Sequence, residues 1–353
     1  LALSLLSCTR QQDTPEPKKP TPGVTDDTIK IGSWGPISGP ASSWGVVTRS
    51  MAAYFDYINE SGGVHGRTIE FVIEDAQYQV PLAVKAANKL INVDDIFAML
   101  GARGTPMNQA TFGRLFEANV PSLFPLTAAR SMYEPLHPLK FSLNVSYQDQ
   151  VRGAMRYMVE NGRYGKVCLQ APATDYGAET VEGYEDIVAE LGLESVYAGR
   201  HKGTETDFVG TATIIKNSGC ELLFMGAFIK DTILLYSAVR DAGWEGTVVT
   251  NMVPYLPEIA VAADGGMEGM YAVAPFFIPD FESVAPDSWT GQWVAGYRDR
   301  FGEEPAAQAV IGYVSADLLV MALDRAGQDL SVEKLVESLE SIGSYQDPFG
   351  GPD

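Results

Sequence analysis

IFAMLGARGTPMNQATFGRLFEANVPSLFPLTAAR, residues 96–130, is the stretch of sequence that decides the fold. Its apolar start, residues 96–100, is typical of a parallel strand that is buried on both faces. A glycine-containing turn follows, and Thr105 is expected to cap a helix whose first turn contains Pro106. Residues 121–124 form a second apolar run that leads into another polar loop. This order of strand, loop, helix, strand and loop predicts one repeat of a parallel α/β sheet.

The ends of these two strands predict a ligand site. In open α/β sheets, ligands bind beyond the carboxyl ends of the strands, and two such ends lie within this stretch. The helix that begins near Thr105 also directs free N–H groups and the positive end of its dipole toward the same crevice. We therefore interpret the two loops as one wall of a small-molecule site.

The same alternation of strands and helices continues through the chain and restarts once, near residue 144. It predicts the α/β class, with two doubly wound parallel-sheet lobes. Two long helices expected at residues 289–301 and 305–326 follow the second lobe, although they would complete the first. The chain is therefore expected to cross back and to form a multi-strand hinge. The expected lobes are residues 28–143 plus 276–341 for lobe 1 and residues 144–273 plus 346–353 for lobe 2.

The N-terminal segment indicates an exported, membrane-attached protein. Residues 1–8 are typical of the end of a signal peptide with a lipobox, in which Cys8 would carry the lipid. The alternative is a plain secretory signal with an incidental cysteine. Residues 9–27 are polar and contain several prolines, which predicts an extended tether. We expect a lipoprotein of the periplasm or cell surface that contacts the membrane through its N-terminal lipid.

Charge and cysteine content narrow the possible partners. The chain of 353 residues carries a formal net charge of −20, which argues against a nucleic-acid partner. Cys168 and Cys220 lie in or beside expected strands. We expect two buried thiols there, with a disulfide as the alternative in an oxidising compartment.

The sequence contains no motif that indicates catalysis or metal binding. Its three histidines are scattered, and the usual zinc, serine-nucleophile and dinucleotide motifs are absent. The loops after the strands instead carry glycine, threonine and aromatic residues, which is the composition of a binding cleft. We expect a binding protein rather than an enzyme, with no cofactor and no metal.

Six segments, taken in order, resemble a known family: IKIGSWGPISGPASSWG, AAYFDYINESGGVHGRTIEFVIEDAQ, LGARGTPMNQA, NVPSLFPLTAA, ATDYGAETVEGYEDIVAELG and FGEEPAAQAVIGYVSADLLVMAL. The chain is similar to the type I periplasmic solute-binding proteins of ABC importers, in the branched-chain amino-acid-binding (leucine/isoleucine/valine) family, and to its lipoprotein members. The resemblance implies a monomer that captures a small-molecule ligand between its lobes by hinge closure and delivers it to ABC permease subunits. The alternatives are a ligand-sensing receptor-type protein and a binder of a larger, neutral, lipid-like molecule.

The resemblance also implies which residues line the site. Trp44 would stack on the ligand, although it could equally be a core residue at a helix start. Arg103 could bind a carboxylate, or it could be a surface arginine on a flexible loop. The complete set is Trp44, Arg103, Gly104, Thr105, Thr127, Ala128, Tyr176, Phe228, Asn251 and Met252.

One departure from the family pattern changes the expected ligand. The acidic residue that pairs with an amino-acid ammonium group in the family would lie near residues 251–253, where this chain has Asn-Met-Val. A buried ammonium group without a carboxylate partner is very costly. We therefore expect a hydrophobic or aromatic solute, including carboxylates, rather than an α-amino acid.

Overall fold

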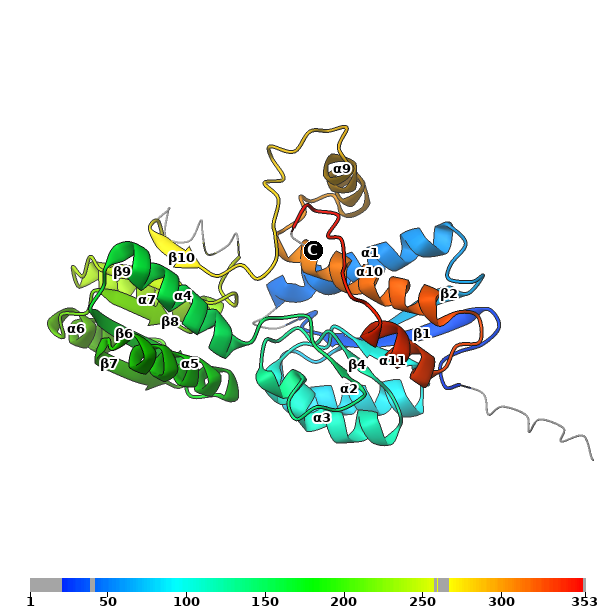
Figure 1. Cartoon of the computed structure of the whole chain (residues 1–353), viewed down its shortest axis with the longest axis horizontal. Helices are drawn as coiled ribbons and strands as arrows, with labels where there is room; N and C mark the ends of the chain where they lie inside the picture. Colours follow the sequence, from blue (N-terminus) through cyan, green and yellow to red (C-terminus); the bar gives the residue numbers. More distant parts are fainter. Residues whose placement is uncertain (1–20, 39–41, 257–258, 260–266, 352–353) are drawn as a thin grey trace, which may run out of the picture.

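The computed structural model describes residues 21–38, 42–256, 259 and 267–351. It contains two lobes, each built on a five-stranded parallel sheet with helices on both faces (Figure 1). The predicted α/β class, with two doubly wound lobes, is therefore confirmed. Cys8 and most of the expected tether lie outside the described residues.

The first sheet has the strand order β2-β1-β3-β4-β5, and all of its pairs are parallel. Its side chains alternate between two layers of helices, as the pleat requires. Ile29 and Ile31 of β1 pack with α1 and α10, whereas Trp34 packs with α2 and α3 on the opposite face. The bounds are β1 (Thr28–Gly35), β2 (Thr68–Asp75), β3 (Ala98–Leu100), β4 (Ser122–Leu123), β5 (Lys140–Phe141), α1 (Gly45–Glu60), α2 (Val80–Asn92) and α3 (Thr105–Glu117), with short 3-10 turns at Ser42–Trp44 and Arg130–Met132.

The chain returns to the first lobe after building the second. Helix α10 (Gln308–Ala326) lies along α1, and α11 (Val332–Glu340) packs beside it (Figure 1). The contact is close because α10 presents Gly312, where a Cβ atom would lie 2.3 Å from the Val47 carbonyl oxygen. Ser50 Oγ also donates a 2.7 Å hydrogen bond to the Ala309 carbonyl. The helix begins three residues later than expected, at Gln308.

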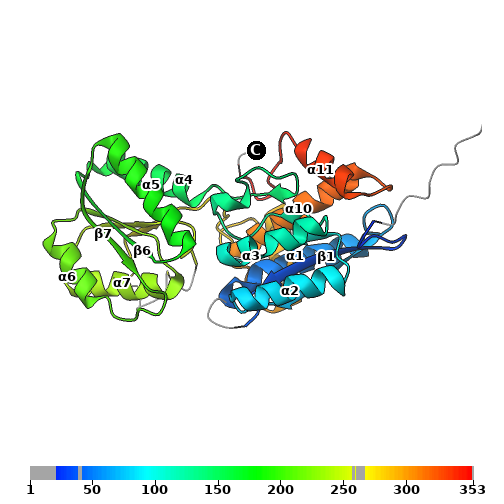
Figure 2. The ribbon, with the colours of Figure 1, turned by 90° about the horizontal axis from the view of Figure 1, so that it is seen from below.

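The second sheet has the order β10-β9-β8-β6-β7 and is also parallel. Helices α4 and α5 cover one face, and α6 and α7 cover the other (Figure 2). The bounds are β6 (Lys166–Pro172), β7 (Glu194–His201), β8 (Leu222–Met225), β9 (Thr247–Thr250), β10 (Met270–Ala272), α4 (Tyr147–Gly162), α5 (Asp175–Leu191), α6 (Val209–Asn217) and α7 (Ile229–Asp241). Helix α9 (Trp289–Phe301) stands apart from both sheets beside α1 and α10 (Figure 1).

Cys168 and Cys220 form a disulfide, so the expectation of two free thiols was wrong. Cys168 lies in β6, and Cys220 lies two residues before the neighbouring strand β8. This parallel pairing brings the two Cα atoms to 6.0 Å, within the range that a disulfide spans.

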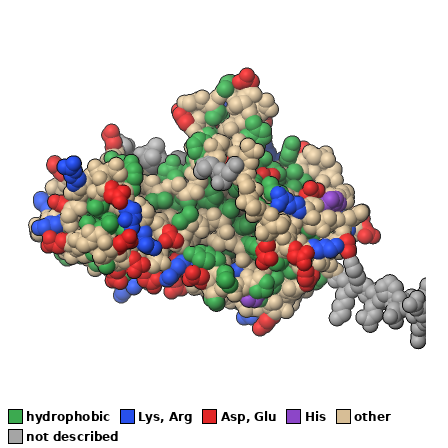
Figure 3. All heavy atoms as spheres, in the orientation of Figure 1, with side chains coloured by type: hydrophobic (Ala, Val, Ile, Leu, Met, Phe, Trp, Pro, Cys, Tyr) green, Lys and Arg blue, Asp and Glu red, His purple; other side chains and the backbone are tan. Residues whose placement is uncertain are grey.

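The end of the expected tether is folded onto the first lobe. Thr21 Oγ1 donates a 3.0 Å hydrogen bond to the Leu330 carbonyl, and Val24 pairs with Ile29 as an isolated bridge. On the face shown in Figure 3, charged side chains are scattered over both lobes, and hydrophobic side chains gather where the lobes meet. Among the described residues, no helix combines the length and apolarity that crossing a bilayer requires.

Candidate ligand-binding site

The candidate site lies between the lobes, beyond the carboxyl ends of both sheets. The loops after β3 and β4 approach it from the first lobe, and those after β6, β8 and β9 approach it from the second. The lobes touch there: the Tyr78 and Phe228 ring centroids are 6.1 Å apart, and both Glu179 oxygens accept a 3.0 Å hydrogen bond from the Arg130 backbone N–H.

Arg103 is stacked on Trp44 at the wall formed by the first lobe. Its Cζ lies 3.7 Å from the centroid of the Trp44 ring, and only 3% of Trp44 is exposed. Two hydrogen bonds with Trp34 fix the loop: the Arg103 N–H donates to the Trp34 carbonyl at 3.3 Å, and Trp34 Nε1 donates to the Arg103 carbonyl at 3.2 Å. Arg103 is therefore partly buried and fixed by these contacts, rather than a surface arginine on a flexible loop.

The Arg103 guanidinium has no carboxylate partner within the described part of the chain. Its Nε is buried and makes no hydrogen bond to a described residue. Burial lowers the pKa of Arg103, while the Tyr78 and Tyr147 hydroxyls oppose that shift. Because arginine stays charged at any physiological pH, Arg103 places between the lobes a positive charge that no described carboxylate neutralises.

The predicted cap of α3 is wrong in one detail. The N-cap is Gly104, with a φ of 99°, and Thr105 is the first helical residue. A residue with a side chain rarely adopts that φ, which explains why glycine stands here. The Thr105 hydroxyl lies instead 2.6 Å from the Thr127 hydroxyl, and Thr127 Oγ1 is 3.4 Å from the Tyr147 hydroxyl.

The loop after β4 is tied to the start of the second lobe. Ala128 is fully buried, and its carbonyl accepts a 2.9 Å hydrogen bond from the Tyr147 N–H at the beginning of α4. Its side chain is a methyl group, so the residue offers a ligand only backbone groups. The threonine hydroxyls and this backbone bond together place the first lobe's two loops against the first turn of α4.

Four aromatic rings form a continuous row from one lobe to the other. The ring centroids of Tyr147 and Tyr176 are 4.7 Å apart, those of Tyr176 and Phe228 are 5.3 Å apart, and Phe228 then meets Tyr78. Burial raises the pKa of Tyr78 to about 12. Sequence reasoning did not select Tyr78 or Tyr147, although Tyr78 lies in the loop after β2, at the same edge of the sheet as the other site loops.

Asn251 and Met252 close the second lobe's side of the site. Asn251 is fully buried, and its amide exchanges hydrogen bonds of 2.9 and 3.1 Å with the Tyr176 hydroxyl. The Met252 N–H donates to Gln150 Oε1 at 3.1 Å. These bonds orient the loop after β9 without any acidic side chain.

The carboxylate of Asp231, which is buried in the second lobe, already has a hydrogen-bond partner. Asp231, 2% exposed, accepts from His201 Nε2 at 3.1 Å, and the other ring nitrogen of His201 lies 3.0 Å from Gln170 Nε2. The described residues also contain no cluster of histidine, cysteine and acidic side chains that could hold a metal ion.

Two hollows, which share Tyr255 and Ala307 in their linings, lie between Trp44 and the edge strand β10 of the second sheet. Trp44 and Met252 line a small hollow of about 10 Å³, and Tyr255 separates it from a larger hollow of about 580 Å³. The larger one is bounded mainly by apolar side chains, including Leu256, Met267 and Met270. A volume of 10 Å³ admits at most one water molecule, so a solute can reach Trp44 only when the lobes or these side chains move apart.

The ten residues predicted for the site are thus brought together at the junction of the lobes, and contacts or a shared hollow link them. Within the described residues, the arrangement offers one cation without a carboxylate partner, two threonine hydroxyl groups, an amide and a row of aromatic rings, three of which are tyrosines. Among these ten residues, no nucleophile is paired with a base. Such a set can bind and orient a small molecule that has an apolar body and one anionic group.

Comparison with known proteins gives consistent results. A family model described as periplasmic binding protein matches residues 28–353. The leucine-, isoleucine-, valine-, threonine-, and alanine-binding protein of Pseudomonas aeruginosa is 23% identical, over 92% of this chain and 85% of that protein. Leu/Ile/Val-binding protein homolog 2 of Brucella abortus is 24% identical, over 93% and 86%.

Solved structures show the same fold. A fatty acid ABC transporter substrate-binding protein from Thermomonospora curvata superposes with a TM-score of 0.83, at 22% identity, over 95% of this chain and 86% of that chain. A branched-chain amino acid transporter substrate binding protein from Streptococcus pneumoniae, in complex with isoleucine, has a TM-score of 0.78, at 19% identity, over 92% and 91%.

Proposed function

Because the chain belongs to the periplasmic binding protein family, branched-chain amino-acid-binding branch, we propose that it captures a hydrophobic or aromatic carboxylate between its lobes for an ABC permease. It is a solute-binding protein of the ABC-transporter type. The proposal concerns the ligand, the residues that bind it and its delivery to the permease. We propose that the ligand contacts both lobes and thereby shifts the open–closed equilibrium toward the closed form.

The observation that carries the proposal is the unpaired Arg103. Leaving a partly buried cation without an anionic partner is costly, and a ligand carboxylate would remove that cost. The guanidinium plane can donate two parallel hydrogen bonds to a carboxylate. The Thr105 and Thr127 hydroxyls lie on the same wall and can donate further bonds.

The second lobe argues against an α-amino acid. Asn251, Met252 and Val253 carry no carboxylate that could pair with an ammonium group, and Asp231 is already paired with His201. The relatives from P. aeruginosa and B. abortus are named for amino acids, whereas the neighbour from T. curvata is named for fatty acids. The apolar hollow of about 580 Å³ beyond Tyr255 supports an aliphatic or aromatic body for the ligand.

Attachment to the membrane is a further part of the proposal. The cysteine at position 8 follows a short apolar run, and the proline-containing segment after it would act as a spacer. We propose a monomeric lipoprotein, anchored at Cys8, that presents its ligand to permease subunits at the periplasmic or outer cell surface. Radiolabelled fatty acid incorporated into the wild-type chain, but not into Cys8→Ala, would support this attachment.

A thermal-shift experiment with matched ligand pairs tests the ligand class. Octanoate and phenylacetate are compared with 1-octanol, 2-phenylethanol and leucine. A binding carboxylate at about a hundredfold excess over its Kd should stabilise the protein by about 2.7 kcal/mol, whereas the alcohols should have little effect. Stabilisation by leucine and by neither carboxylate would contradict the proposal.

The variant Arg103→Met tests the residue that carries the proposal. It keeps an apolar side chain of similar length over Trp44 but removes the charge. Since a hydrogen bond to a charged group contributes about 1.5–3 kcal/mol, we expect the Kd for the carboxylate to rise by at least about tenfold. Arg156→Met is the matched control and should leave the Kd unchanged, because it removes a partly exposed arginine of α4 that pairs with Glu190 of α5.

A further inference from the structure

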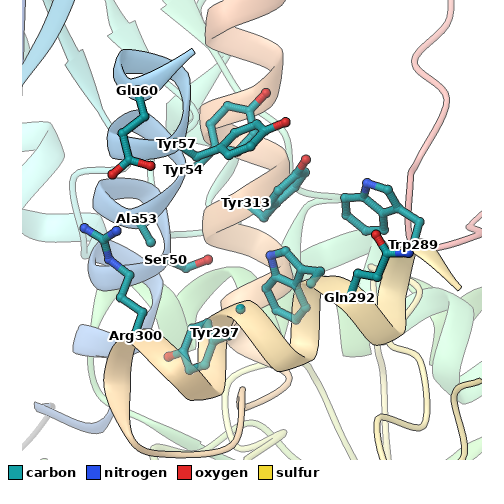
Figure 4. A pocket seen from close by; sticks show the side chains of 12 residues that line it. Ser50, Ala53, Tyr54, Tyr57, Glu60, Trp289, Gln292, Tyr297, Arg300 and Tyr313 are labelled. Carbon is teal, nitrogen blue, oxygen red and sulfur yellow. The ribbon is translucent and has the colours of Figure 1, made fainter. Parts of the chain in front are cut away.

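A second cavity lies on the first lobe, away from the junction of the lobes. It has a volume of about 440 Å³, is open on one side and is lined by α1, α9 and α10 (Figure 4). The candidate ligand site begins at Trp44, at the start of α1, whereas the part of α1 that lines this cavity runs from Ser50 to Glu60. At 1.5 Å per residue, Ser50 and Glu60 lie about 9 and 24 Å from Trp44 along the helix. Volumes of about 300–1,000 Å³ are typical of small-molecule sites.

Half of the residues that line this cavity are aromatic. The residues are Tyr54, Tyr57, Trp289, Trp293, Tyr297 and Tyr313. Tyr313 is central among them, with its ring centroid 4.6 Å from that of Tyr54 and 5.4 Å from that of Trp289. These pairs meet edge to face, at interplanar angles of 72° and 78°, so the rings are turned in different directions around the hollow (Figure 4).

The charges around the cavity leave a negative surplus. The lining arginine, Arg300, forms an ion pair with Asp56 and is thereby neutralised. Glu60, which lines the rim, makes no ion pair with any described residue, and its side chain extends along α1 in Figure 4.

A second carboxylate lies behind the aromatic wall. Asp317 accepts hydrogen bonds from the hydroxyls of Tyr54 and, at 2.8 Å, Tyr345, and it has no basic partner in the described part of the chain. Both phenols have raised pKa values, with burial as the largest cause, so they act as neutral donors and leave the carboxylate charge uncompensated.

We propose that this cavity binds an organic cation of the alkylated ammonium class. The faces of tryptophan and tyrosine rings attract cations through the ring quadrupole. Proteins recognise quaternary ammonium groups by arranging several such rings around one hollow. Glu60 and Asp317 add two negative charges on the side of α1 and α10. An anionic ligand would meet both charges, and a neutral ligand would gain nothing from them. This inference does not depend on the ligand proposed for the site between the lobes.

Calorimetric titration of the full chain with choline chloride tests the proposal. The neutral probe is 3,3-dimethylbutan-1-ol, which has the shape of choline with carbon in place of the charged nitrogen. Choline should bind at one site per chain and at least about tenfold more tightly than the alcohol. No heat of binding up to 50 mM choline, or equal binding of the two probes, would overturn the proposal.

Two exposed positions allow the site to be altered without disturbing the core. Trp289 is 43% exposed, and Trp289→Leu keeps an apolar side chain while removing the ring. We expect it to weaken choline binding by about 2- to 30-fold, which is the range that one cation–π contact provides. Glu60→Gln should weaken binding several-fold, and this difference should shrink in high salt.

The control variant is Glu185→Gln, which makes the same charge change at an exposed position of α5 in the other lobe. It should leave the choline Kd unchanged. If Trp289→Leu and Glu60→Gln both bind choline as the wild type does, while their unfolding curves are normal, the assignment of this cavity is wrong. The octanoate affinity of the same variants is measured in parallel. It should stay unchanged, because octanoate is proposed to bind between the lobes, so the two proposals are tested separately.

Discussion

Gly104 determines how the first lobe presents its wall to a ligand. Its φ of 99° turns the chain from the Arg103 loop into α3, and a Cβ atom there would lie 2.0 Å from Met107 Cε and 3.1 Å from Tyr78 Cε2. The missing side chain therefore allows two things at once: the backbone conformation, and the approach of Tyr78 to the start of the helix.

We predict that Gly104→Ala destabilises the protein by roughly 1–3 kcal/mol, because the added methyl group is strained in that conformation and displaces Met107. Urea unfolding followed by circular dichroism measures the change. Gly113→Ala is the matched control: it lies inside the same helix, where a Cβ atom would meet nothing within 4 Å. It should stabilise by about 0.4–1 kcal/mol. Equal effects of the two substitutions would contradict the importance of the Gly104 conformation.

At the scale of elements, the return of α10 to α1 ties the C-terminal part of the chain to the first lobe. The sequence predicted this return, because the strand–helix pattern of the first lobe was incomplete. It could not predict the closeness of the two helices, which depends on Gly312 facing the Val47 carbonyl. A glycine inside a helix costs stability unless packing compensates for it.

Replacing Gly312 with alanine is predicted to destabilise the protein by roughly 1–3 kcal/mol, although alanine is the better helix former. The reason is that α10 must move away from α1 to admit the methyl group. Thermal unfolding of Gly312→Ala and of Gly153→Ala, an open position in α4, gives the comparison. An increase in stability at both positions would show that the helices are not packed as described.

The sequence predicted whole elements better than the contacts between them. The two lobes and most strands followed from hydrophobic patterning, which is a local property. The disulfide and the Thr105–Thr127 pair depend on which strands become neighbours, and that information is not local. Tyr78 was missed for the same reason, since nothing in its own segment indicates that Phe228 will face it.

For the whole molecule, the contacts between lobes set the balance between open and closed forms. Arg130 reaches across to α5, where its side chain pairs with Glu182 and its backbone N–H is bound by Glu179. Burial raises the pKa of the Glu179 carboxyl, because partial exclusion of water disfavours its charged form. The pair with Glu182 is more exposed and contributes little by itself.

We predict that the double variant Glu179→Gln, Glu182→Gln shifts the ligand-free protein toward the open form. Its radius of gyration in small-angle scattering should increase, and its affinity for the ligand should fall by about 2- to 10-fold, because closure is then less favourable. Glu185→Gln on the same helix is the control. A double variant with unchanged scattering and affinity would mean that these contacts do not hold the lobes together.

The order of segments along the chain has a consequence for biogenesis. Strands β6 to β10 and helices α4 to α7 lie between the two parts of the chain that build the first lobe. As the protein leaves a translocation channel from its N-terminus, strands β6 to β10 of the second lobe emerge before α10 does. The first lobe therefore cannot complete its fold until the second lobe has emerged, and the apolar face of α1 stays uncovered during that time. A chaperone that protects the unfinished protein would act during this interval, and we expect it to bind the uncovered apolar face of α1.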